Sequence, residues 1–223
     1  MHETFSIPTG DASVEGDLVT VDRSHGTVIF AHGSGSSRFS PRNRHVARAL
    51  QSRGLSTLLV DLLTIEEERS ERVTRHLRFN VDMLARRLVG VTAWLMTMPA
   101  HASMPIGYFG ASTGAAAALI AAAHAPTQIA AIVSRGGRPD LAGDSLPAVR
   151  APTLLVVGGS DTDVLVLNRR AQSAIRTTAQ LEVIPGATHL FEEPGALDRV
   201  ARVASEWFLH HFDAAKLTMR SVG

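Results

Sequence analysis

The pentapeptide Gly-Ala-Ser-Thr-Gly at residues 110–114 constrains the fold of this chain more than any other feature. A short apolar run at residues 106–109 leads directly into it, and an alanine-rich stretch that ends near Pro126 follows it. A G-x-S-x-G pattern between a strand and a helix forms a turn so sharp that bulky flanking side chains would collide with neighbouring backbone. The serine hydroxyl is then held clear of the backbone at the start of a helix, whose dipole favours developing negative charge. The pattern predicts a nucleophilic Ser112 at this turn.

Short β-branched runs alternate with amphipathic helical stretches along the rest of the chain. The apolar runs predict strands at residues 18–21, 27–31, 56–60, 106–109, 129–133, 153–157 and 181–184. Helical spacing, caps and breakers predict helices at residues 41–53, 77–98, 113–125, 164–176 and 197–211. This alternation is typical of an α/β protein with a mostly parallel sheet and helices on both faces.

Length and composition limit what such a fold can be. The 223 residues fit one domain, expected over residues 1–211, with residues 212–223 expected to form a frayed tail. The formal net charge of +1 does not indicate a surface that binds nucleic acid or an acidic membrane. We expect a cytoplasmic protein, because neither a secretory signal nor an apolar run of roughly 18 residues is visible. We also expect a monomer or homodimer. The absence of cysteine excludes a thiolate nucleophile and cysteine-based zinc sites.

A base and an acid for the serine follow from the positions of the later strands. Serine is a poor nucleophile unless a base lies within hydrogen-bond reach. His189 comes just after the last predicted strand, and Asp161 follows the double glycine that ends the strand before it. The carboxyl ends of parallel strands meet at one edge of a sheet, so these residues should converge on Ser112 in the chain order expected of α/β-hydrolases. Asp163 is the alternative acid, although its position also suits a helix cap.

An acyl-transfer site also needs N–H donors for the oxyanion of the tetrahedral intermediate. The first is expected at Thr113, the residue after the nucleophile, and the second in the small-residue loop that follows the strand at residues 27–31. We assign Ser34 to the second position, with Gly33 as the near alternative.

Four segments of the chain carry a resemblance to a known family. Residues 31–37, 110–114, 158–161 and 187–189 resemble the dienelactone hydrolase-like branch of the α/β-hydrolase superfamily, and the similarity extends over nearly the whole length. The resemblance implies an α/β-hydrolase fold and a hydrolase of small esters or lactones that needs no metal and no cofactor. Dienelactone hydrolases proper use a cysteine nucleophile where this chain has Ser112. The serine leaves the expected fold and acyl chemistry unchanged and bears only on whether a dienelactone is the substrate.

Further features bear on the substrate. Arg135 or Arg138, after the strand at residues 129–133, could hold a substrate carboxylate, because a guanidinium group binds a carboxylate bidentately. In the alternative interpretation, the arginine forms an ion pair with a nearby acid such as Asp140. Residues 134–152 are too few for a lid domain, so the site should be fairly open to small substrates.

The charge run at residues 66–72 favours a solvated helix start over a metal site.

Two classes of function fit these observations. The first is a serine hydrolase that cleaves small carboxylic esters, lactones or thioesters through an acyl-enzyme, with peptidase and perhydrolase activities of the same fold left open. The second is a catalytically silent binding module. The presence of Ser112, Asp161 and His189 in the expected order favours the hydrolase, because a binding module needs none of the three.

Overall fold

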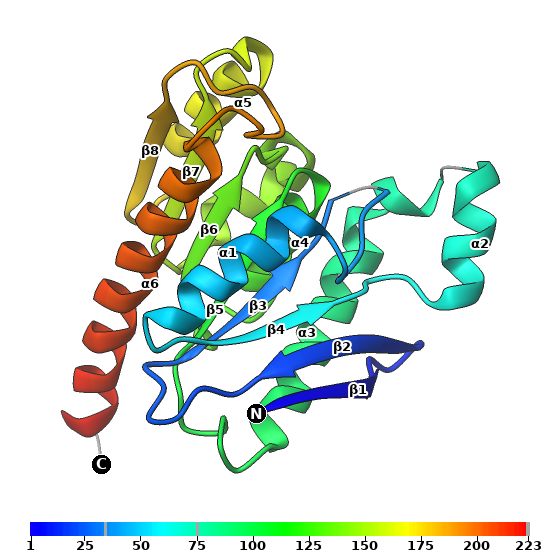
Figure 1. Cartoon of the computed structure of the whole chain (residues 1–223), viewed down its shortest axis with the longest axis vertical. Coiled ribbons are helices and arrows are strands. Elements are labelled where there is room, and N and C mark those ends of the chain that lie inside the picture. The colour runs from blue at the N-terminus through cyan, green and yellow to red at the C-terminus, as the bar shows by residue number, and fades with distance from the viewer. Residues whose placement is uncertain (34, 75, 222–223) are drawn as a thin grey trace.

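A computed structural model describes residues 1–33, 35–74 and 76–221 of the chain. In these ranges eight strands form one sheet in the order β1-β2-β4-β3-β5-β6-β7-β8 (Figure 1). The strands are β1 (His2–Pro8), β2 (Ser13–Val19), β3 (Thr27–Ala31), β4 (Ser56–Val60), β5 (Ile106–Ala111), β6 (Ile129–Arg135), β7 (Thr153–Gly158) and β8 (Ala179–Ile184). β1 and β2 are antiparallel to their neighbours and every other pairing is parallel. The predicted α/β class with a mostly parallel sheet is confirmed.

Helices cover both faces of the sheet, as predicted (Figure 1). They are α1 (Pro41–Ser52), α2 (Ile65–Thr74), α3 (Val81–Thr97), α4 (Thr113–His124), α5 (Thr162–Ala174) and α6 (Ala196–Ser221), with 3-10 segments η1 (Leu77–Phe79) and η2 (Pro139–Ala148). α1 and α6 contribute to the core on one face, and α3, α4 and α5 contribute to the core on the other. Between β6 and β7 the described chain forms only η2, so no lid domain is inserted there. None of the described helices combines the length and apolarity needed to cross a bilayer.

The central strands follow directly from the sequence. The predicted runs at residues 27–31 and 56–60 coincide with β3 and β4, in which every residue is buried. Strands covered on both faces read as continuous apolar runs, which makes their limits easy to locate. The predicted cap of α1 is also present, because the Asn43 N–H donates to the Ser40 hydroxyl oxygen at 3.3 Å and Pro41 is the first helical residue.

Two ends of the chain differ from the prediction. β1 was not predicted, and the strand placed at residues 18–21 begins at Ser13, because β1 and β2 form an antiparallel edge whose outer strand buries only Ile7. The last helix does not end near His211, because α6 continues through Ser221. Phe212 is fully buried there and packs against Phe208 at 5.6 Å between ring centroids. Phe212, one helical turn after Phe208, therefore extends the part of α6 that packs on the core.

Candidate active site

Ser112 joins β5 to α4 in a strained backbone conformation. Its φ of 51° and ψ of −121° lie in a region that residues other than glycine rarely occupy. Backbone hydrogen bonds hold this conformation: the Ser112 N–H donates to the Arg135 carbonyl at 3.2 Å, and the Ser112 carbonyl accepts from the N–H groups of Arg138 and Ala115, each at 3.1 Å. Strain that is compensated in this way is found most often at functional sites.

The glycines on either side of Ser112 leave no room for a side chain. A Cβ on Gly110 would lie 2.4 Å from the Ala115 Cα, and a Cβ on Gly114 would lie 2.3 Å from the Ala31 carbonyl oxygen. Both obstacles are backbone atoms that cannot turn aside. The close approach of β3, β5 and α4 therefore requires glycine at both positions, which is the physical reason for the G-x-S-x-G spacing.

The structure brings His189 and Asp161 together. His189 lies in the loop between β8 and α6, and Asp161 precedes α5 after β7. The His189 Nδ1 is 2.7 Å from the Asp161 carboxylate Oδ2, and the two side chains are 39% and 15% exposed. The alternative acid, Asp163, is exposed in the first turn of α5. The carboxylate that contacts the imidazole is therefore that of Asp161.

His189 lies close to the segment that holds Ser112. A Cβ placed on Gly136 would be 3.5 Å from the His189 Cε1, and Gly136 directly follows Arg135, whose carbonyl binds the Ser112 N–H. Within the described ranges the Ser112 hydroxyl and His189 form no hydrogen bond. Such contacts are often long in proteins without substrate and tighten when substrate binds. Because Nδ1 contacts Asp161, Nε2 is the imidazole nitrogen that remains for a proton transfer.

Two of the predicted oxyanion donors, Gly33 and Thr113, lie next to Ser112. A Cβ on Gly33 would be 3.0 Å from the Ser112 Cβ, so the loop after β3 lies directly against the serine. Thr113 is the first residue of α4 and is almost fully buried. Ser34, our first choice for the second donor, lies outside the described residues.

His32 orders this loop, a role that the sequence did not suggest. The Leu62 N–H donates to the His32 Nε2 at 3.2 Å, so this nitrogen carries no proton. Nδ1 is then protonated and donates to the Gly33 carbonyl at 2.9 Å. The buried imidazole therefore ties the loop that faces Ser112 to the segment after β4. The position of His32, next to Gly33, is the one sequence signal that could have indicated this.

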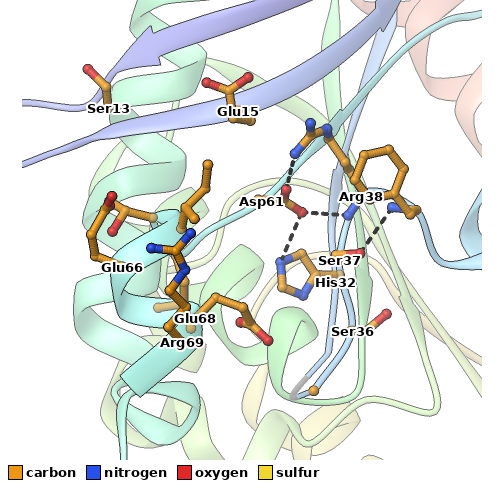
Figure 2. Close-up of a pocket in the computed structure, with 15 residues that line it drawn as sticks. Ser13, Glu15, His32, Ser36, Ser37, Arg38, Asp61, Glu66, Glu68 and Arg69 are labelled. Carbon is orange, nitrogen blue, oxygen red and sulfur yellow. Dashed lines mark hydrogen bonds and ion pairs between the residues drawn. The ribbon is translucent and has the colours of Figure 1, made fainter. Parts of the chain in front are cut away.

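A cavity of about 870 Å³ opens beside the loop after β3 (Figure 2). Its walls come from β2, the loop before α1, the end of β4 and α2, and they include Glu15, His32, Asp61 and Glu68. A second, narrow cavity shares His32 and Glu68 with the first and is also lined by Gly33 and Thr113. Ser112 lines neither cavity, and the large cavity is lined by His32, which binds the Gly33 carbonyl in the loop that lies against Ser112.

The two candidate substrate arginines differ in their surroundings. The Arg138 guanidinium donates two hydrogen bonds to Asp140, at 2.9 and 2.7 Å, and this pairing raises the pKa of Arg138. Arg135 is only 8% exposed, and burial together with the nearby charge of Arg42 lowers the pKa of Arg135 to about 10. The sequence did not suggest Arg42, because nothing local shows that α1 faces the end of β6.

The charge run before α3 is not simply solvated. Glu67 of α2 forms a bidentate pair with Arg87, with 2.7 Å between Oε1 and Nη2, and this hydrogen bonding lowers the pKa of Glu67. Arg87 is buried in α3, so the pair fixes the start of α2 against the body of the molecule. Among the described residues, no group of three or more histidine or acidic side chains is arranged to hold a metal ion.

The mostly parallel sheet, with a strained serine at the turn after its central strand, places the molecule among the α/β-hydrolase folds. The chain belongs to the dienelactone hydrolase family, whose sequence pattern matches residues 16–214.

Similar proteins support this assignment. A crystal structure of a dienelactone hydrolase from Anabaena variabilis is 55% identical, has a TM-score of 0.93, and matches 95% of this chain and 98% of its own. Est1E from Butyrivibrio proteoclasticus is 16% identical with a TM-score of 0.78 over 94% of this chain and 99% of its own, and shows the shared fold alone. Mycobacterium tuberculosis proteins that carry the provisional name phosphoribosyl transferase are 57% identical over 209 residues, 94% of this chain. This chain spans 46% of their length.

Proposed function

We propose that the protein is a serine hydrolase that cleaves small carboxylic esters, lactones or thioesters through an acyl-enzyme intermediate. The observation that carries the proposal is the strained Ser112 at the head of α4, with the His189–Asp161 hydrogen bond in loops at the same edge of the sheet. Membership of the dienelactone hydrolase family supports hydrolysis as the reaction type. No step of the proposal requires a metal or a cofactor.

The proposed reaction uses each group in turn. The Ser112 hydroxyl attacks the carbonyl carbon of the substrate while the His189 Nε2 accepts its proton. Asp161 holds the imidazole in the required tautomer and stabilises the imidazolium that forms. The Thr113 N–H and an N–H from the loop of Gly33 and Ser34 stabilise the oxyanion. His189 then returns the proton to the leaving oxygen or sulfur, and a water molecule attacks the acyl-enzyme by the same route.

The surroundings of Ser112 favour small or partly exposed substrates. His189 remains 39% exposed, and the described chain inserts no lid domain between β6 and β7. The cavity of about 870 Å³ beside the loop after β3 offers room for a group attached to the reacting carbonyl.

A fluorophosphonate probe tests the proposal directly, because it reacts only with an activated serine. We expect labelling of Ser112 and turnover of p-nitrophenyl acetate. Ser112→Ala should remove the labelling and reduce turnover by about 10⁴-fold or more, with His189→Ala nearly as severe. Ser173→Ala, on the exposed side of α5, is the matched control and should behave as wild type. A folded protein that is neither labelled nor active on a panel of esters, lactones and thioesters would instead be a silent binding module.

Phosphoribosyl transfer is a second candidate only because of the provisional name of the Mycobacterium tuberculosis relatives. This chain spans 46% of those proteins, and the family that it matches is one of hydrolases. We therefore favour hydrolysis. Release of pyrophosphate from phosphoribosyl pyrophosphate by the purified chain would reverse this preference.

A further inference from the structure

Arg135 is a buried cation without a partner. Its side chain is 8% exposed, and its Nη1 is buried and makes no hydrogen bond to any described residue. No carboxylate in the described part of the chain forms an ion pair with it. A buried charge is normally retained only when another group compensates it, because its desolvation is unfavourable. The missing partner of Arg135 is therefore expected to be a ligand.

A second arginine increases the unbalanced positive charge. Arg42, in the first turn of α1, is close enough for its charge to lower the pKa of Arg135, and its Nε is also buried without a partner. Among the described residues its acidic contact is with Glu192 at 3.1 Å, and that carboxylate is 64% exposed and hence well screened. The cluster of Arg135, Arg42 and Glu192 thus keeps an excess of positive charge, and Arg135 is its least compensated member.

The cluster lies beside the candidate nucleophile. The Arg135 carbonyl accepts the Ser112 N–H, and the next residue, Gly136, is close to the His189 imidazole. Because side chains alternate along a strand, Arg135 points to the same face of β6 as Val133, the face covered by α1 and α6. Glu192 belongs to the loop that carries His189, so the Arg42 side chain contacts that loop while the Arg135 backbone contacts Ser112.

We propose that Arg135 and Arg42 bind a phosphate group on the substrate. This inference rests on the proposed hydrolase, since the phosphate would be part of the ester or of its product. Guanidinium groups bind phosphate bidentately, and a phosphate has enough oxygens to engage both arginines at once. A carboxylate has two oxygens, which suffice for one bidentate guanidinium, whereas the three free oxygens of a phosphate monoester can accept from both. The number of acceptor oxygens therefore favours a phosphate over a carboxylate.

Thermal unfolding in inorganic phosphate tests the site without any turnover. Phosphate in roughly fivefold excess over its dissociation constant should raise Tm by about 2–4 °C. Sodium acetate at equal ionic strength should not. Arg135→Met should abolish the increase while leaving Tm without phosphate equal or higher, because an unpaired buried charge has been removed. Arg42→Gln, at a more exposed position, should weaken the increase. Arg199→Gln, which removes an exposed arginine paired with Glu182, should leave it unchanged.

Substrate preference gives the second measurement. A p-nitrophenyl ester with a phosphate on its acyl chain should have a kcat/KM about 10- to 100-fold above that of the neutral ester of equal length. Arg135→Met should remove this preference. Equal stabilisation by acetate and phosphate, or a preference that survives in both arginine variants, would overturn the inference. Stabilisation by phosphate without hydrolysis of any ester would instead support the anion site and refute the proposed hydrolase.

Discussion

Replacement of Asp161 by asparagine tests the assignment of the acid most sharply. The Asp161 carboxylate lies 2.7 Å from the His189 Nδ1, so in the proposed mechanism it stabilises the imidazolium that forms when Ser112 loses its proton. At an effective dielectric constant of about 20, opposite charges at this separation attract by about 6 kcal/mol. His189 is 39% exposed, and solvent on that side screens part of the attraction. After this screening we take the attraction as about 4 kcal/mol, so its loss in Asp161→Asn should lower kcat by about 10³-fold.

The asparagine amide can also favour the wrong histidine tautomer, in which Nε2 carries the proton and cannot accept one from Ser112. The assay is initial-rate hydrolysis of p-nitrophenyl acetate, together with the rate of fluorophosphonate labelling. Asp163→Asn removes the same charge two residues further on, in an exposed position, and should retain at least half of the activity. Comparable losses in the two variants, or a loss of less than about threefold in Asp161→Asn, would refute the assignment.

Two predictions concern stability. Gly114→Ala would place a Cβ 2.3 Å from the Ala31 carbonyl oxygen, and overpacking of about 3 kcal/mol should lower Tm by about 6–12 °C in calorimetry; an unchanged Tm would show that the turn after β5 can relax. Burial lowers the pKa of His101, so below about pH 6.5 the unfolded chain binds more protons than the folded one and the free energy of unfolding should fall as pH falls. Urea titrations between pH 7 and 5 measure this change in the free energy of unfolding with pH, which should be smaller in His101→Gln than in wild type. It should not vanish, because burial also lowers the pKa of His211. An equal pH dependence in the variant and the wild type would show that His101 does not contribute to it.

The parts of the molecule that could be predicted from the sequence are those specified locally. β3 and β4 read as continuous apolar runs, and the turn at Ser112 has a pattern that follows from steric exclusion. The pairing of Asp161 with His189 required one further step, the rule that carboxyl ends of parallel strands share an edge. Each of these inferences depends on a few consecutive residues or on chain order alone.

The features that could not be predicted depend on contacts between distant segments. β1 is an edge strand held by pairing with β2, and its mostly exposed residues give little apolar signal. α2 has a weak apolar face and is fixed by the pair between Glu67 and Arg87, twenty residues apart. The unbalanced charge at Arg135 becomes visible only when α1 is placed against the end of β6. Electrostatic balance is a property of the assembled fold, so a local pattern cannot reveal it.

The turn after β6 connects all the proposed roles. The carbonyl of Arg135 and the N–H of Arg138 hold the strained backbone of Ser112, and Gly136, with a φ of 51°, brings the chain close to the His189 imidazole. The same turn supplies the buried guanidinium of Arg135. One short segment of backbone therefore contacts the proposed nucleophile and the proposed base and carries the proposed phosphate-binding arginine. A strained residue persists only where the surrounding structure over-determines its conformation, and the hydrogen bonds from this turn to the Ser112 backbone supply that constraint.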